Sequence, residues 1–197
     1  MQVCSMLYLM HQYELSIFNH RSIDMFCYAT VWISLLSVVQ WITFTSIEGH
    51  FQIEAPATLE SRIQQISTPV GTIDYHTFFH DAQTDTAGNF LFLISTCNYP
   101  EGTIHSDSIA ILEEFFTATV EQSVHAVSGE VVFTDKIRYR SFPGRFWRIH
   151  YNNGRTVMKT KCFLVDDRFF SIQVAVDANY SLHPAIDRFF DSFKVIS

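Results

Sequence analysis

Short motifs that specify common enzymatic chemistry are absent from this sequence. There is no Gly-x-x-x-x-Gly-Lys or Gly-x-Gly-x-x-Gly nucleotide loop, and no Gly-x-Ser-x-Gly turn for a serine nucleophile. The acidic pairs Glu113-Glu114 and Asp166-Asp167 fit a solvated helix face and a turn better than an acid–base pair. We therefore predict that the protein is not an enzyme and uses no cofactor. An enzyme of unrecognised type stays open as a third hypothesis, because catalytic residues need not be close in sequence.

Metal-ligand spacing and cysteine pairs are also scarce. His76 and His80 would lie on one side of a strand but about 13 Å apart, too far for one metal ion, so we predict no metal site. Of the four cysteines, only Cys97 and Cys162 lie in the expected folded part. Both occur in apolar, strand-like runs, where a free cysteine usually behaves as a small buried hydrophobic residue. A disulfide between them is the alternative in an oxidising compartment.

Charged residues make up only 17% of the chain, and they are unevenly distributed. Between Glu48 and Asp135, thirteen acidic residues accompany a single basic one, Arg62. The stretch that follows, residues 136–161, is basic. Its cations either neutralise acidic elements of the same domain or form a binding surface for an anionic protein or for lipid head groups. The net charge of −7 argues against nucleic acid as the partner. This basic stretch contains no acidic residue and eight basic ones: Lys136, Arg138, Arg140, Arg145, Arg148, Arg155, Lys159 and Lys161.

Residues 25–47 contain no charged side chain. A run of this length and composition can cross the hydrocarbon core of a bilayer, about 30 Å thick, as a helix. We predict a transmembrane anchor that attaches the protein to the membrane, with a cleaved signal peptide and a buried core helix as the alternatives. The anchor and the signal peptide both place the following domain on the extracytoplasmic side: at the cell membrane, in the periplasm or outside the cell. Residues 1–24 carry no signal that we can assign.

The following domain is expected to span residues 50–197 and to mix strands with helices. Residues 51–55 alternate apolar and polar side chains, and residues 90–96 are apolar on both faces, as in a central strand. Residues 106–124 change to helical spacing, with Ser106 placed to cap the helix. A second, short helix is expected to begin at Pro184.

Residues 142–176 indicate a meander of three strands. Large apolar side chains on both of its faces require that other elements cover both sides of the sheet. The expected turns are Pro143-Gly144, Asn153-Gly154 and Asp166-Asp167. The expected cross-strand pairs are Ile149 with Met158, Arg148 with Lys159, Leu164 with Phe169 and Phe163 with Phe170.

The order of these elements resembles that of small exported bacterial proteins of the PsbP-like superfamily. The resemblance covers about residues 50–196. It implies an α/β/α sandwich, in which helices flank both faces of an antiparallel sheet, and a non-enzymatic binding or assembly role; it identifies no site residue. The stretches that carry it are Phe51-Gln52-Ile53-Glu54-Ala55-Pro56, Thr68-Pro69-Val70-Gly71, Tyr99-Pro100, Phe142-Pro143-Gly144-Arg145, Leu164-Val165-Asp166-Asp167-Arg168-Phe169-Phe170 and Phe189-Phe190-Asp191-Ser192-Phe193-Lys194.

We therefore expect an α+β domain, preceded by an N-terminal hydrophobic helix. The leading functional hypothesis is a non-catalytic extracytoplasmic binding or assembly module, membrane-anchored or exported, that uses the eight basic residues between 136 and 161. The alternative is a binder of lipid or of another small anionic ligand, because the same cations could hold an anionic group.

Overall fold

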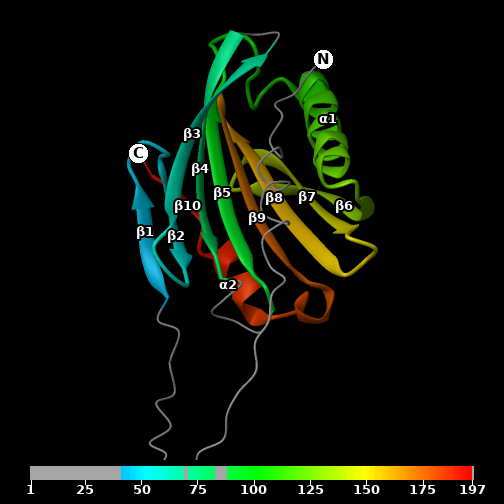
Figure 1. Cartoon of the computed structure of the whole chain (residues 1–197). Helices are drawn as coiled ribbons and strands as arrows, with labels where there is room; N and C mark the ends of the chain where they lie inside the picture. The colour runs from blue at the N-terminus through cyan, green and yellow to red at the C-terminus, as the bar shows by residue number, and fades with distance from the viewer. Residues whose placement is uncertain (1–40, 69–70, 83–87, 197) are drawn as a thin grey trace, which may run out of the picture.

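The computed structural model describes residues 41–68, 71–82 and 88–196. Within these ranges the chain forms ten strands, two α-helices and one 3-10 helix (Figure 1). In chain order the elements are β1 (Ile42–Ser46), β2 (Phe51–Ala55), β3 (Glu60–Thr68), β4 (Gly71–Asp81), β5 (Leu91–Asn98), α1 (Ile109–Val127), β6 (Glu130–Tyr139), β7 (Phe142–Tyr151), β8 (Thr156–Val165), β9 (Arg168–Asp177), the 3-10 helix η2 (Ala178–Tyr180), α2 (Pro184–Asp191) and β10 (Lys194–Val195).

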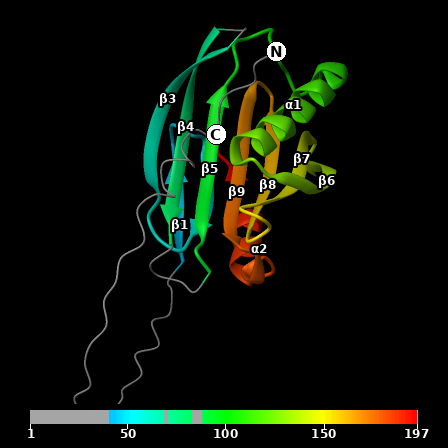
Figure 2. The ribbon, with the colours of Figure 1, turned by 45° about the vertical axis from the view of Figure 1, so that its right-hand side comes forward.

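Seven of these strands form one antiparallel sheet in the order β3-β4-β5-β9-β8-β7-β6 (Figure 2). Its two edges are β3 and β6. A smaller sheet has the order β1-β2-β10 and is also antiparallel. The expectation of an α+β domain built on an antiparallel sheet is therefore confirmed.

The central strand β9 has apolar cover on both faces. All of its residues except the two at its ends are buried. Because side chains alternate along a strand, Phe169 and Phe170 point to opposite faces of the sheet. Phe169 packs in a cluster with α1, and Phe170 packs in a second cluster with α2, β1 and β2. We call these two sides the α1 face and the α2 face; Figure 1 shows α1 on one side of the large sheet and β1 and β2 on the other.

The C-terminal residues close the α2 face with aromatic contacts. The ring of Phe193 lies 5.3 Å from that of Phe170, 6.1 Å from that of Phe163 and 5.4 Å from that of Tyr139, measured between ring centroids. The Tyr139 hydroxyl oxygen accepts a hydrogen bond of 3.0 Å from the backbone N–H of Val195. Offset and edge-on ring contacts of this kind stabilise a core beyond the apolar area that they bury.

The expected meander is present, and β6 extends it to four strands. The four cross-strand pairs predicted from the sequence are all found, including Arg148 opposite Lys159. The expected turn at Pro143-Gly144 is wrong, because the chain reverses at Arg140 and Ser141, with Arg140 in a left-handed conformation (φ 55°). Gly144 instead lies inside β7, where a Cβ atom would collide with the carbonyl oxygen of Cys162.

The helix α1 begins at Ile109, later than the expected start near Ser106. The loop before it is held by the turn between β8 and β9, since the N–H of Ser106 donates to the carbonyl of Asp166 at 2.9 Å. The residue that caps the helix is Ser108, whose side chain makes no capping hydrogen bond. Tertiary contact with the β8–β9 turn therefore sets the start of the helix, in place of a side-chain cap.

One carboxylate ties α1 to the edge of the sheet. Glu113 accepts from Lys136 Nζ on β6 and from Arg145 Nη2 on β7, each at 2.9 Å. The Arg145 guanidinium also lies 5.8 Å from the ring centroid of Phe116. The hydrogen bonds that Glu113 accepts, of which the one from Lys136 has the larger effect and the one from Arg145 the next, hold the pKa of Glu113 below its usual value.

The expected hydrophobic helix over residues 25–47 is wrong at its C-terminal end. Residues 42–46 form β1, which pairs with β2, and residues 25–40 lie outside the described residues, as do residues 1–24. Apolar Ile42 and Phe44 alternate with Thr43 and Thr45, a period of two that suits a strand with one buried face. The domain therefore includes β1, which lies before the expected start at His50. None of the helices in the described ranges is long and apolar enough to span a membrane.

A substitution in β1 tests this boundary. The ring of Phe44 lies 5.6 Å from that of Phe78 and 6.1 Å from that of Phe51. We expect Phe44→Ala to lower the free energy of unfolding by about 2 kcal/mol, because the truncated side chain leaves a gap in the core. Thr43→Ala, on the exposed side of the same strand, should change it by less than about 0.5 kcal/mol. Equal effects of the two substitutions in urea unfolding would contradict the strand assignment.

Glu113 supplies a pH-dependent test of how α1 is fixed. A carboxyl group whose pKa is lowered by folding adds stability above its unfolded pKa and loses it as the pH falls through the folded pKa. We expect Glu113→Gln to lower the free energy of unfolding at pH 7 by less than about 1 kcal/mol, since the group is half exposed. The difference from the unsubstituted protein should shrink as the pH falls below about 4 and the Glu113 carboxylate becomes protonated.

The neighbouring exposed residue Glu114 provides the matched control. Glu114 forms no ion pair within 4.0 Å in the described part of the chain. Thermal unfolding of Glu114→Gln between pH 3 and pH 7 should follow that of the unsubstituted protein. If both substitutions gave the same pH profile, Glu113 would not be the residue that fixes α1.

Candidate binding surface

The eight basic residues predicted from the sequence come from β6, β7, β8 and the turns between them. Cross-strand partners share a face, so the pairing of Lys136 with Arg145 and of Arg145 with Cys162 places the first two cations on the α1 face. Lys159 is paired with Val174, which belongs to the cluster on the α2 face. The cations therefore divide between the two faces of the sheet and its turns, and they do not all lie on one surface.

Most of these cations have a polar partner within the domain. Lys136 and Arg145 contact Glu113, and the Arg145 side chain is only 12% exposed. Lys161 Nζ lies 3.0 Å from Asp191 Oδ1 on α2. The remaining contacts involve backbone or neutral groups and an aromatic ring: Arg138 donates to the Ser141 carbonyl, Arg155 donates to Asn152, and Arg140 lies over the ring of Tyr139.

Arg148 and Lys159 differ from the other cations. They face each other across β7 and β8 on the α2 face, and both are half-buried. Within the described residues neither forms an ion pair with an acidic group, and the buried Nε of Arg148 has no hydrogen-bond partner. Burial lowers the pKa of Lys159, Asp187 on α2 opposes this shift and Arg148 adds to it. Two cations are thus held together and partly desolvated without a carboxylate in contact, which is unfavourable unless an anion joins them.

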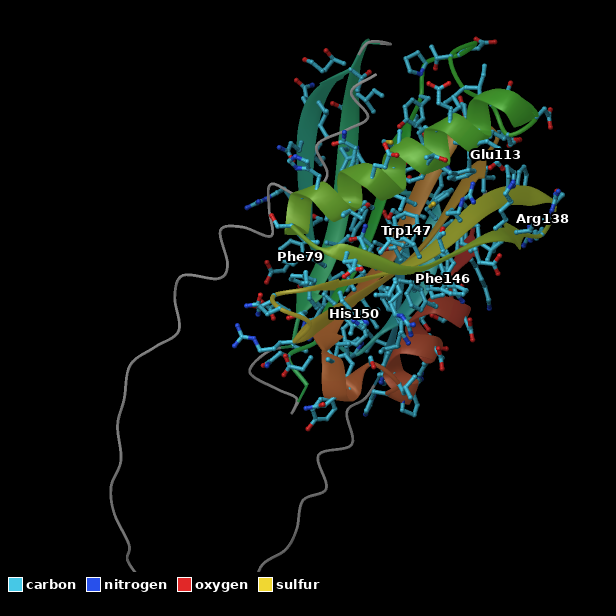
Figure 3. All side chains as sticks on the ribbon, turned by 90° about the vertical axis from the view of Figure 1, so that its right-hand side faces the viewer. Phe79, Glu113, Arg138, Phe146, Trp147 and His150 are labelled. Atoms are coloured by element: carbon cyan, nitrogen blue, oxygen red, sulfur yellow. The ribbon has the colours of Figure 1, made fainter. Side chains whose placement is uncertain are left out.

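Two aromatic rings adjoin this cation pair. Phe133 on the edge strand β6 is paired with Arg148, and its ring lies 5.7 Å from that of Phe146 on β7. Phe133 is 44% exposed, although it is a large apolar side chain. Figure 3 shows Phe146 on the side of the β6–β7 ribbon nearer α2, and Trp147 on the side nearer α1. We call Phe133, Phe146, Arg148 and Lys159 the basic–aromatic patch.

The sequence did not indicate that Phe133 belongs to this surface. In a regular strand Val131 and Phe133 would share a face, because side chains alternate. The pairing of β6 with β7 shifts between them, so Val131 lies opposite Ile149 and Phe133 lies opposite Arg148. This β-bulge moves Phe133 to the α2 face. A helix-like or strand-like pattern in the sequence carries no signal for such a shift.

The other sequence candidates remain separate from the patch. His76 and His80 lie on β4, three strands away from β8 in the sheet order, and no group of three or more metal-ligating side chains is found among residues 41–68, 71–82 and 88–196. Cys97 and Cys162 are both buried, and no disulfide joins them. Burial raises the pKa of the Cys162 thiol far above its usual value, which opposes a role as a nucleophile.

Comparisons with known proteins give a match in structure only. No protein-family profile matches the chain, and no curated protein sequence matches it significantly. The solution structure of cyanobacterial PsbP (CyanoP) from Synechocystis sp. PCC 6803 matches with a TM-score of 0.51 and 11% identity, over 81% of this chain and 95% of that one. A protein of unknown function from Pseudomonas aeruginosa matches with a TM-score of 0.39 and 10% identity, over 77% of this chain and 94% of that one. The chain therefore has a PsbP-like fold.

Proposed function

We propose that this protein is a non-catalytic binding or assembly module that holds an anionic partner on its basic–aromatic patch. The observation that carries the proposal is the pair of half-buried cations, Arg148 and Lys159, facing each other with no carboxylate in contact. A protein that keeps two like charges partly desolvated gains stability when a ligand neutralises them. The likeness to PsbP, with helices on both faces of the sheet as in an α/β/α sandwich, supports a binding role and carries no site from that protein.

Only part of the predicted basic surface suits this role. Lys136, Arg145 and Lys161 are occupied by Glu113 and Asp191, so a partner would have to displace internal ion pairs to use them. Reversal of Arg145 would place a second carboxylate beside Glu113 and would mainly loosen α1. Among the described residues, Arg148 and Lys159 have no carboxylate in contact, so an anion could bind them without breaking an internal ion pair, and the exposed Phe133 is the cross-strand partner of Arg148.

We further propose that the domain is exported. Because β1 takes residues 42–46, the uncharged segment that can precede the domain is 25–41. That segment is shorter than the roughly 20 residues that usually cross a bilayer as a helix, and it suits the apolar part of a secretory signal. The domain would then act in the periplasm or outside the cell, and the membrane anchor becomes the second candidate.

The binding role is tested by two double charge reversals of equal size. We expect Arg148→Glu/Lys159→Glu to reduce partner capture from an extract of the native cell at least about tenfold, because it replaces attraction by repulsion. Arg138→Glu/Arg155→Glu changes the net charge equally but lies at exposed positions away from the patch, and it should capture the partner normally. Equal loss in both variants would reveal a general charge effect, and normal capture by the first variant would refute the patch as the binding site.

Export is tested by the N-terminus of the protein isolated from its own cells. We expect mass spectrometry to find a chain that starts close to Ile42 and no later, because cleavage removes the apolar part of the signal and a later start would remove β1 from the small sheet. An intact chain that resists carbonate extraction from membranes would support the anchor instead. An intact chain in the soluble cytoplasmic fraction would contradict both alternatives.

A further inference from the structure

The surroundings of the basic–aromatic patch indicate what kind of anion it accepts. An inference about the ligand rests on the function proposed above, namely that this patch is a binding site. Two features of the α2 face bear on it: the nearby carboxylates and the exposed ring of Phe133.

Carboxylates border the patch on two sides. On β6, Asp135 is paired with Phe146 and Glu130 is paired with His150, which places both on the same face as Arg148. On α2, Asp187 is near enough to Lys159 to oppose the lowering of its pKa. A broad layer of negative charge laid over this face would therefore meet carboxylates as well as cations. The net charge of −7 adds repulsion over a longer range.

The apolar part of the patch also favours a small, localised ligand over a broad anionic layer. Phe133 is 44% exposed and its ring lies 5.7 Å from that of Phe146, and Phe133 is the cross-strand partner of Arg148, so the aromatic surface and this cation share one face of neighbouring strands. Exposed aromatic side chains next to an arginine are typical of the centres of protein–protein interfaces. A free inorganic anion would use the cations and leave the rings without a role. A peptide with an acidic residue beside an apolar one would use both.

We propose that the basic–aromatic patch binds a short acidic segment of a partner protein, with a carboxylate between Arg148 and Lys159 and a neighbouring aliphatic or aromatic side chain on Phe133 and Phe146. The segment lies over the sheet between the edge strand β6 and α2. Its charges are confined to the position of the two cations, so that Asp135, Glu130 and Asp187 remain outside the contact.

A selection from a displayed library of random nonapeptides tests the ligand class on the full chain. We expect enriched peptides to carry Asp or Glu next to Leu, Ile, Phe, Tyr or Trp, because both halves of the patch then contribute. Their amide analogues, with Asn and Gln in place of Asp and Glu, should bind at least about tenfold more weakly. Enrichment of peptides without acidic residues would overturn the proposal, and so would the absence of any enriched peptide.

Variants assign the selected binding to the patch. Arg148→Gln/Lys159→Gln, which keeps side-chain length and avoids new repulsion, should weaken a selected peptide about tenfold. Phe133→Ala should weaken it roughly fivefold and remove the preference for an apolar neighbour. Arg138→Gln/Arg155→Gln should leave it unchanged. Thermal unfolding of each variant checks that the domain is intact, and equal binding by the patch variants and the control would overturn the assignment.

Two other anionic probes separate this inference from its alternatives and from the proposed function. Vesicles of phosphatidylglycerol and inorganic phosphate should not compete with a selected peptide at equal charge concentration; efficient competition by either would replace the acidic peptide by a phosphate-bearing ligand. If partner capture from the cell extract depends on Arg148 and Lys159 while no acidic peptide binds, the proposed function is supported and the proposed ligand class is refuted. If capture does not depend on these two residues, the proposed function itself is refuted.

Discussion

The burial of β9 on both faces is the constraint on which the rest of the structure depends. The strand is hydrogen-bonded to β5 on one side and to β8 on the other, and its side chains are buried along nearly its whole length. A strand with apolar residues on both faces is stable only between two covering layers. α1 supplies the cover on one face, and α2 with β1, β2 and the C-terminal residues supplies it on the other. Both ends of the described chain are thus drawn into the same core.

The elements that cover the α2 face leave the edge of the sheet at Phe133 exposed. α2 packs on β9 and β2 and reaches β8 through the pair of Lys161 with Asp191. The next strands, β7 and β6, carry Arg148 and a partly exposed Phe133. On the α1 face the corresponding cations are neutralised by Glu113, which comes from the covering helix itself. Within the described part of the chain, the same basic stretch therefore forms ion pairs with Glu113 on the α1 face and leaves Arg148 and Lys159 without a carboxylate in contact on the α2 face, because side chains alternate along each strand.

The N-terminal boundary shows how one composition can serve two structures. An uncharged, apolar run satisfies the requirements of a membrane helix, and its last part also satisfies those of a half-buried strand when Thr alternates with Ile and Phe. In this fold the second use is realised from Ile42 onward, since β2 offers an unpaired edge and Phe78 offers an apolar surface. The boundary expected at His50 misses β1, because an uncharged apolar run satisfies the criterion for a membrane helix even where its side chains also alternate with a period of two.

The sequence by itself determined the antiparallel α+β class and the pairing of the meander, including Arg148 opposite Lys159, because turn residues and alternation act over a few positions. Only the tertiary structure decided which cations are neutralised: the partners of Arg145 and Lys161 are 32 and 30 residues away in the chain. It also decided that Phe133 stands beside Arg148, since the bulge after Val131 appears only when β6 pairs with β7. Local patterns set period and register, whereas charge compensation and exposure depend on which elements become neighbours in space.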